Sequence, residues 1–308
     1  MSQRQPVDRR PIDMRAAAVM AVLCLIWGTQ QVTIKAAAAQ MSPILQLGVR
    51  SALAAMATLG LAAARGELRA MTRATVLPGL AVGVFFGLEF VFAGEALRRT
   101  SASHVTVYLY CAPLMIAFGL GLVHRDERLR PAQWLGVALA FAGVALTFLG
   151  RGDPGLYPAM RLGDALALAG AASWAITAIV LRGSRLADAP ATITLFYQLV
   201  GAGLLATTTA LTLGETAVHA DAALALSLVW QVAVVAFGSY LTWFALLRRY
   251  SATRLGVLSF LTPVFGVAAG IILMGDRIDG GFAIGACMIL IGIVIATTGL
   301  PHLRRAYR

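Results

Sequence analysis

Two stretches of the chain are near copies of each other. Residues 97–105 read LRRTSASHV and are followed by Pro113. Residues 247–255 read LRRYSATRL and are followed by Pro263, so both features recur 150 residues further along. In each copy a double arginine ends one apolar segment, a turn of small residues follows, and the next apolar segment contains a proline. Self-similarity at this distance predicts that the chain is two copies of one unit, residues 1–150 and 151–308.

The composition indicates that the solvent of this chain is lipid. Hydrophobic residues make up 59% of the 308 residues and charged residues only 13%, with a mean hydropathy of +0.80. A soluble domain is about a quarter charged. The net charge of +11 does not indicate nucleic-acid binding, because the arginines stand singly or in pairs between apolar runs. The three cysteines fit no metal-binding or disulfide spacing, so we expect no metal site.

Apolar runs of about 20 residues are long enough to cross a membrane as helices. Ten such runs are separated by short polar turns, so we expect an all-α integral membrane protein with ten transmembrane helices. The predicted spans are residues 15–37, 42–64, 75–97, 102–123, 131–150, 162–183, 190–213, 226–247, 252–274 and 281–300.

Arginine and lysine gather in alternate loops, which predicts that both termini are cytoplasmic. The abundance of arginine and alanine favours a bacterial source. Each repeat holds five spans, an odd number, so the second copy must enter the membrane from the opposite side. The two halves are therefore predicted to be inverted repeats, a recurrent plan of secondary transporters in which the substrate site lies near the midplane.

Several short motifs follow one another as they do in a known family. They are Trp27-Gly28, Arg50, Pro113, Glu127-Arg128-Leu129, Gly136 and Gly143, then Gly163-Asp164, Ser173-Trp174, Pro263, Gly285 and Gly292. In the order and duplication of these motifs, the chain resembles the drug/metabolite transporter (DMT) superfamily. Within it, the chain resembles the branch of ten-span proteins with two EamA-type domains. Asp276 stands where that family usually has glutamate. The resemblance implies a carrier in the inner membrane that exports small metabolites through a central cavity without a cofactor.

The chain is also similar to the YddG-type aromatic amino-acid exporters of that superfamily. No short motif separates these from exporters of threonine, homoserine or drugs. The second half has Tyr197 at the position equivalent to Arg50, so any role of that arginine is not duplicated.

The third predicted span carries a carboxylate, Glu89, near its middle. An ionisable group at this depth costs at least about 2.5–3.5 kcal/mol on insertion scales, so we expect it to face a cavity or a partner. Phe85 shares its helical face. Gly79, Gly83 and Gly87 form a separate face of small residues, which lets another helix approach closely.

Two interpretations of Glu89 remain open. In one, its carboxylate contacts a substrate amine or carries a proton that couples transport. In the other, it forms a structural ion pair with Arg50. Both residues lie about eight positions from the outer ends of their spans, or about 12 Å deep at roughly 1.5 Å per residue.

The substrate pocket is predicted to lie between spans 1, 3, 4, 6, 8 and 9, which rests partly on the family resemblance. Its aromatic rings would stack on the cargo, and its polar groups would meet the polar end. The glutamines of span 1 need partners inside a membrane, from either a wet cavity or another helix. The predicted substrate-binding residues are Trp27, Gln30, Gln31, Phe85, Glu89, Tyr108, Trp174, Thr177, Ser239, Tyr240, Trp243 and Ser259.

Pro113 and Pro263 each remove a backbone donor and bend a helix. Bends at equivalent positions of the two repeats predict a hinge. His104, near the outer end of span 4, is interpreted as a structural residue, because a lone histidine is more often satisfied by its neighbours than used for coupling.

The predicted function is secondary transport: export of small metabolites by alternating access, with amino acids favoured and aromatic amino acids foremost. The expected partners are a small-molecule substrate and the lipid bilayer, with no nucleic acid. No Gly-x-x-x-x-Gly-Lys loop is present, so no ATPase subunit is expected. The alternatives are export of threonine-like or homoserine-like metabolites or cationic drugs, an integral membrane enzyme, a channel or a scaffold subunit. The sequence lacks the clustered histidines and carboxylates typical of membrane enzymes.

Overall fold

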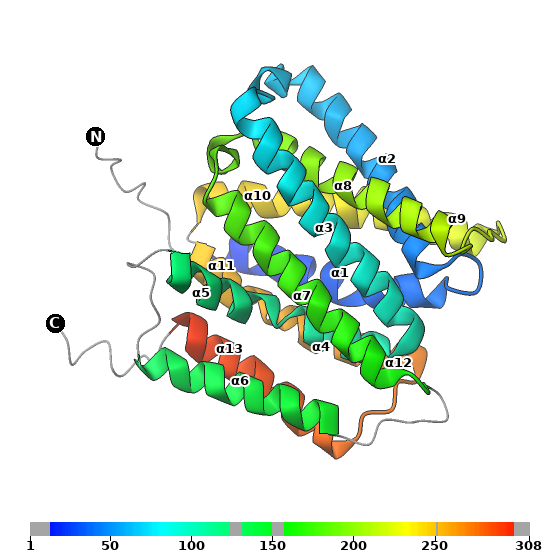
Figure 1. Cartoon of the computed structure of the whole chain (residues 1–308), viewed down its shortest axis with the longest axis vertical. Coiled ribbons are helices and arrows are strands. Elements are labelled where there is room, and N and C mark those ends of the chain that lie inside the picture. The colour runs from blue at the N-terminus through cyan, green and yellow to red at the C-terminus, as the bar shows by residue number, and fades with distance from the viewer. Residues whose placement is uncertain (1–12, 124–130, 150–156, 251, 299–308) are drawn as a thin grey trace.

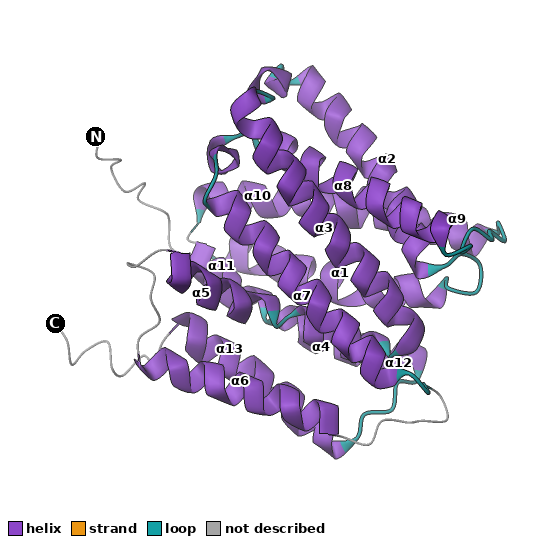
Figure 2. Cartoon of the chain, viewed as in Figure 1, coloured by secondary structure: helices purple, strands orange, loops and turns teal. Residues whose placement is uncertain are grey.

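The computed structural model describes residues 13–123, 131–149, 157–250 and 252–298. Within these ranges the regular structure is helical, and the β contact recorded is one isolated bridge between Met41 and Val218. Figure 2 shows helices joined by short loops. The all-helical class predicted from the sequence is therefore confirmed.

The first half begins with two long helices and ends with a helix that packs on the second half. Its elements are α1 (Met14–Ala36), α2 (Pro43–Ala64), the 3-10 helix η1 (Glu67–Ala70), α3 (Arg73–Arg99), α4 (Ala102–Leu109), α5 (Ala112–Val123) and α6 (Pro131–Leu149).

The second half follows the same plan of spans, but its 3-10 helix comes after its first long helix, and its third span is divided into three segments. Its elements are α7 (Met160–Arg182), the 3-10 helix η3 (Arg185–Asp188), α8 (Ala191–Thr212), α9 (Ala222–Val229), the π-helix η4 (Trp230–Ser239), α10 (Tyr240–Arg249), α11 (Ala252–Ser259), α12 (Leu261–Met274) and α13 (Gly280–Thr298).

The described residues contain seven helices long and apolar enough to cross a membrane, which makes the chain a multi-pass membrane protein. They are α1, α2, α3, α4 with the first part of α5, α7, α8, and the continuous run from α9 to α10. The other predicted spans hold shorter apolar helices at residues 133–147, 261–274 and 280–296. The count of ten crossings thus stays a prediction.

Two of the predicted spans are broken into two helices each. Span 4 is split between α4 and α5 at Tyr110, and span 9 is split between α11 and α12 at Phe260. Pro113 and Pro263 lie three residues further on, and proline has no N–H to donate to the carbonyl four residues before it. Those carbonyls belong to the last residues of α4 and α11. Both spans are therefore interrupted at equivalent positions of the two repeats, and the hinge stays a prediction.

The span that follows α8 has a feature with no counterpart in α3. Its ten central residues, Trp230–Ser239, form a π-helix between two α-helices. Such segments are rare and often occur at functional sites. The side chain of Ser239 donates to the carbonyl of Val235 at 2.6 Å, inside this segment.

Equivalent helices of the two halves pack against each other. α6 lies beside α13, and α2 beside α8, although each pair is far apart in sequence. Figure 1 shows α6 in green next to α13 in red. Another set of contacts also corresponds between the halves: α1 packs on α12, while α4 and α5 pack on α7. Self-complementary contacts of this sort are those made by units related by a two-fold axis.

The predicted small-residue face of α3 is where α8 docks. A Cβ atom added to Gly83 would lie 2.7 Å from the carbonyl oxygen of Tyr197, and one added to Gly87 would lie 2.7 Å from that of Gly201. A Cβ atom on Gly201 would come within 2.0 Å of the Gly83 oxygen. The two backbones thus touch, which only glycine permits, and this seam joins the two halves.

Candidate functional site

A buried pair of opposite charges lies where α2, α3 and α10 meet. Arg50 of α2 is fully buried, and Glu89 of α3 is 9% exposed. The guanidinium of Arg50 lies over the ring of Phe90, 4.8 Å from its centroid. Tyr240, the first residue of α10, is near enough to both charges to interact with them electrostatically. The ring of Phe86 contacts that of Tyr240, with the two ring centroids 6.5 Å apart.

The expected ion pair between Arg50 and Glu89 is not a hydrogen-bonded contact. Each guanidinium nitrogen of Arg50 lacks a hydrogen-bond partner, and so does Oε2 of Glu89. The two groups attract each other through space only. The reason is the orientation of the guanidinium, which is stacked on Phe90. The result is a buried cation and a buried anion that both keep unused polar atoms.

A second group of predicted residues joins α1 to the π-helix. The indole Nε1 of Trp27 donates to Oγ of Ser239 at 2.8 Å. Trp243 packs edge-on against Trp27, with ring centroids 5.6 Å apart. Ser239 directly precedes Tyr240, so this group is continuous along the chain with the charged cluster. The structure thus brings together Trp27, Ser239, Tyr240 and Trp243, all predicted from the sequence.

The other predicted residues are more dispersed. Gln30 and Gln31 are buried in α1, and Oε1 of Gln31 has no hydrogen-bond partner. Trp174 of α7 packs edge-on against Tyr110 at the break of span 4. The hydroxyl of Thr177 donates to the Ser173 carbonyl at 3.0 Å, and that of Ser259 to the Gly256 carbonyl at 2.7 Å, so both bond within their own helix turn.

Tyr108 does not join the aromatic group at Trp27. It is fully buried, and its hydroxyl donates to Oγ1 of Thr147 on α6 at 2.7 Å. Phe85 is half-buried, and the rings next to the charged cluster are those of Phe86 and Phe90 instead. Sequence analysis missed these two. Their spacing from Gly79 and Gly83 could have revealed them, because residues 79, 83, 86 and 90 lie along one stripe of the helix.

A separate polar network joins helix ends at one end of the molecule. Nδ1 of His104 lies 3.0 Å from both carboxylate oxygens of Asp164, and the ring of His104 stacks on Phe282 at 3.8 Å. Asp276 accepts from the backbone N–H and the hydroxyl of Ser103, at 3.0 and 2.7 Å. The Nζ of Lys35 donates to the carbonyl of Leu97 at 2.8 Å. His104 is thus held by its neighbours, as expected for a structural residue.

The same kind of contact occurs at both ends of the molecule. The hydroxyl of Thr100 donates to Oδ1 of Asp164 at 2.8 Å, and the hydroxyl of Tyr250 donates to Oδ2 of Asp13 at 3.0 Å. Thr100 and Tyr250 follow the two double arginines, and the two carboxylates lie at the starts of the first helices of the repeats, α7 and α1. The first contact is buried and the second is exposed.

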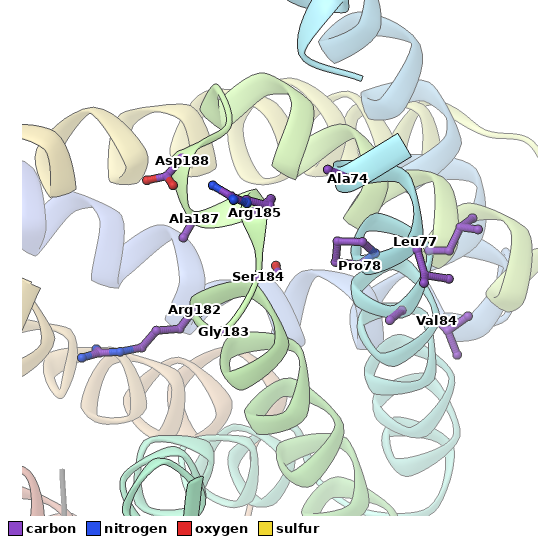
Figure 3. Close-up of a pocket in the computed structure, with 12 residues that line it drawn as sticks. Ala74, Leu77, Pro78, Val84, Arg182, Gly183, Ser184, Arg185, Ala187 and Asp188 are labelled. Atoms are coloured by element: carbon purple, nitrogen blue, oxygen red, sulfur yellow. The ribbon is translucent and has the colours of Figure 1, made fainter. Parts of the chain in front are cut away.

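Two cavities are open at the surface, away from the charged cluster. The larger, about 930 Å³, lies between the start of α3 and the α7–η3 connection. Figure 3 shows Leu77 and Pro78 of α3 on one side of it and Ser184 and Arg185 on the other. The smaller, about 390 Å³, is lined by Lys35 and its neighbours. Neither is lined by a residue of the predicted pocket, so the central cavity stays a prediction.

Comparison with known proteins gives these features a context. Residues 14–149 and 161–298 each match the EamA-like transporter family. A probable amino-acid metabolite efflux pump of Salmonella typhimurium is 30% identical over 295 residues, which cover 92% of this chain and 95% of the relative. An aromatic amino acid exporter, YddG, of Ancylobacter novellus is 26% identical over 228 residues, covering 70% and 74%.

A solved crystal structure, 23% identical in sequence, superposes with a TM-score of 0.64 over 92% of this chain and 97% of that one, so the fold is shared. The two family matches span nearly all the described residues. The chain therefore belongs to the EamA-like transporter family, within the superfamily that its motifs resemble.

Proposed function

We propose that this protein exports amino acids and related small metabolites across the bacterial cytoplasmic membrane by alternating access, with aromatic amino acids as its preferred cargo. In this proposal its two halves are inverted repeats of five spans, and both termini are cytoplasmic. Export of other metabolites or of cationic drugs is the second candidate, since the buried carboxylate Glu89 suits an amine with or without a carboxylate.

The observation that carries the proposal is the buried charged cluster in a chain of the transporter family. Ionisable groups inside a membrane are expensive and are usually retained for function. Glu89 and Arg50 are both buried within helices, keep unused polar atoms, and adjoin the rings of Phe90 and Tyr240. The names of the two relatives support an amino-acid cargo.

A difference between the two halves supports alternating access. α3 lies along α7 over a long interface, whereas the equivalent pair in the other half, η4 with α1, meets over few residues. In each end state of an inverted-repeat carrier, the two halves are alike in sequence but pack differently. Exchange of the two packing arrangements between the halves converts one end state into the other. The hydrogen bond of Thr100 is buried and that of Tyr250 is exposed, so the two halves differ in these contacts as well.

The test is flux of radiolabelled phenylalanine and threonine into proteoliposomes of the purified protein, with and without a pH gradient. We expect saturable phenylalanine flux, accelerated by unlabelled phenylalanine on the opposite side, with little threonine flux. Flux that neither saturates nor responds to the opposite side would indicate a channel. Absence of flux for every amino acid tested would refute the proposed cargo and direct the search to cationic drugs.

A further inference from the structure

The most unusual side chain in the molecule is Arg50. A guanidinium carries five N–H donors in one plane and is always charged. Here it is fully buried, and none of its three nitrogens has a hydrogen-bond partner. Buried donors left unpaired are costly, and for a charged group the cost is larger. The ring of Phe90 covers one face of the guanidinium and leaves the donors at its edge unused.

A nearby acceptor, the carboxylate of Glu89, does not accept a hydrogen bond from the guanidinium of Arg50. Glu89 is buried close enough to attract Arg50, and its Oε2 also lacks a partner. If the pair were purely structural, a direct contact would lower the energy of both groups, because paired buried charges are far less costly than separate ones. Two opposite charges held near each other without contact instead match a ligand that carries both charges itself.

We propose that Arg50 binds the carboxylate of the transported amino acid and that Glu89 binds its ammonium group. A planar guanidinium fits a carboxylate with two parallel hydrogen bonds, which a lysine could not provide. The side chain of the cargo would lie against Phe86 and Tyr240, whose rings already contact each other. This inference rests on the proposed function and narrows it to zwitterionic α-amino acids.

The repeat gives the site a single orientation. The position equivalent to Arg50 in the second half is Tyr197, and the position equivalent to Glu89 is Ser239. The two charges therefore occur once in the chain although the helices that carry them occur twice. One cargo molecule binds per chain, with its carboxylate toward α2 and its ammonium toward α3.

The experiment compares three cargoes that differ in one charged group each. They are phenylalanine, phenylethylamine, which lacks the carboxylate, and 3-phenylpropionate, which lacks the amine. Flux and ligand-induced thermal stabilisation of purified protein are measured for wild type, Arg50→Gln, Arg50→Lys and Glu89→Gln. Arg161→Gln, an exposed arginine at the start of α7, is the matched control for loss of one positive charge.

Wild type should prefer phenylalanine to either analogue by roughly 100-fold or more, because a site built to hydrogen-bond a charged group rejects a ligand that lacks it. Arg50→Gln should lose the preference over phenylethylamine and keep that over 3-phenylpropionate, and Glu89→Gln should do the reverse. Arg50→Lys, which keeps the charge, should fold and lose part of the preference. Arg161→Gln should behave as wild type.

The inference is overturned if wild type transports phenylalanine and both Arg50 variants keep the wild-type ratio of phenylalanine to phenylethylamine. It is also overturned if Arg50→Lys folds and every cargo stabilises it as in wild type. A wild-type protein that transports no amino acid refutes the proposed function, and this inference with it. The two failures are thus distinguished by the wild-type flux alone.

Discussion

Removal of the Thr100 hydroxyl should open the end of the molecule at which the polar network joins helix ends. This hydroxyl is buried and donates to the carboxylate of Asp164 at 2.8 Å. Hydrogen bonds to charged groups contribute about 1.5–3 kcal/mol. The lower figure applies to Thr100→Val, because His104 still holds Asp164 and the Thr100 carbonyl still accepts from Lys35. A loss of about 1.5 kcal/mol is roughly a tenfold change in the ratio of open to closed molecules.

The assay is thiol labelling at Ala167, which is fully buried on α7 about one turn from Asp164. Ala167→Cys is placed in a variant without the three native cysteines and is treated in vesicles with a membrane-impermeant maleimide. We expect the labelling rate to rise about tenfold in Thr100→Val, in line with the population ratio above. The matched control is Tyr250→Phe, which removes the equivalent hydroxyl at the other end and should not raise the rate. Equal rates in the parent and Thr100→Val, or equal rises in both variants, would refute the reasoning.

Three further outcomes follow from the packing. Pro113→Ala and Pro263→Ala restore a backbone donor at the two helix breaks, so turnover should slow more than cargo affinity falls; unchanged turnover in both would exclude the hinge. Gly201→Ala inserts a Cβ atom 2.0 Å from a backbone oxygen and should destabilise the purified protein by about 1–3 kcal/mol or more in thermal unfolding. Its control, Gly60→Ala, has open space around the new Cβ atom and should stabilise the protein by up to about 1 kcal/mol in the same assay. Trp27→Phe removes the hydrogen bond to the π-helix and should lower flux about tenfold without loss of expression; wild-type flux would show that this bond is dispensable.

Much of the fold could be predicted because the signals in the sequence are local or repeated. Proline lacks a backbone donor wherever it stands, so the sequence shows that breaks near Pro113 and Pro263 are possible. It does not show that a break must occur, because Pro78 lies inside the continuous helix α3. The glycine face of α3 was likewise visible as spacing, since close helix approach needs small residues. Which helix it meets was not visible, because α8 lies more than 100 residues further along the chain.

The candidate site was predicted only in part, and the reason is geometric. Depth along a helix can be counted from its ends, and this counting predicted that Arg50 and Glu89 lie near each other. The direction of a long side chain cannot be counted, and Arg50 lies over the ring of Phe90, whereas a structural ion pair with Glu89 was one of the two interpretations left open by the sequence. A helical wheel also assumes that a helix has one buried face, whereas α3 packs on both α7 and α8. For this reason Phe86 and Phe90 are buried in addition to Glu89.

The contact of Gly83 with Gly201 limits how this protein can move. Where two backbones touch, no side chain lies between them that could change rotamer and let the helices slide. While they are in contact, α3 and α8 should therefore not slide along each other, although they belong to different halves of the chain, and any change in their packing must separate them. The interrupted helices, α4 with α5 and α11 with α12, are the segments that we expect to bend in the proposed cycle. For the proposed cycle, this contact therefore predicts that α3 and α8 separate from each other and do not slide past each other.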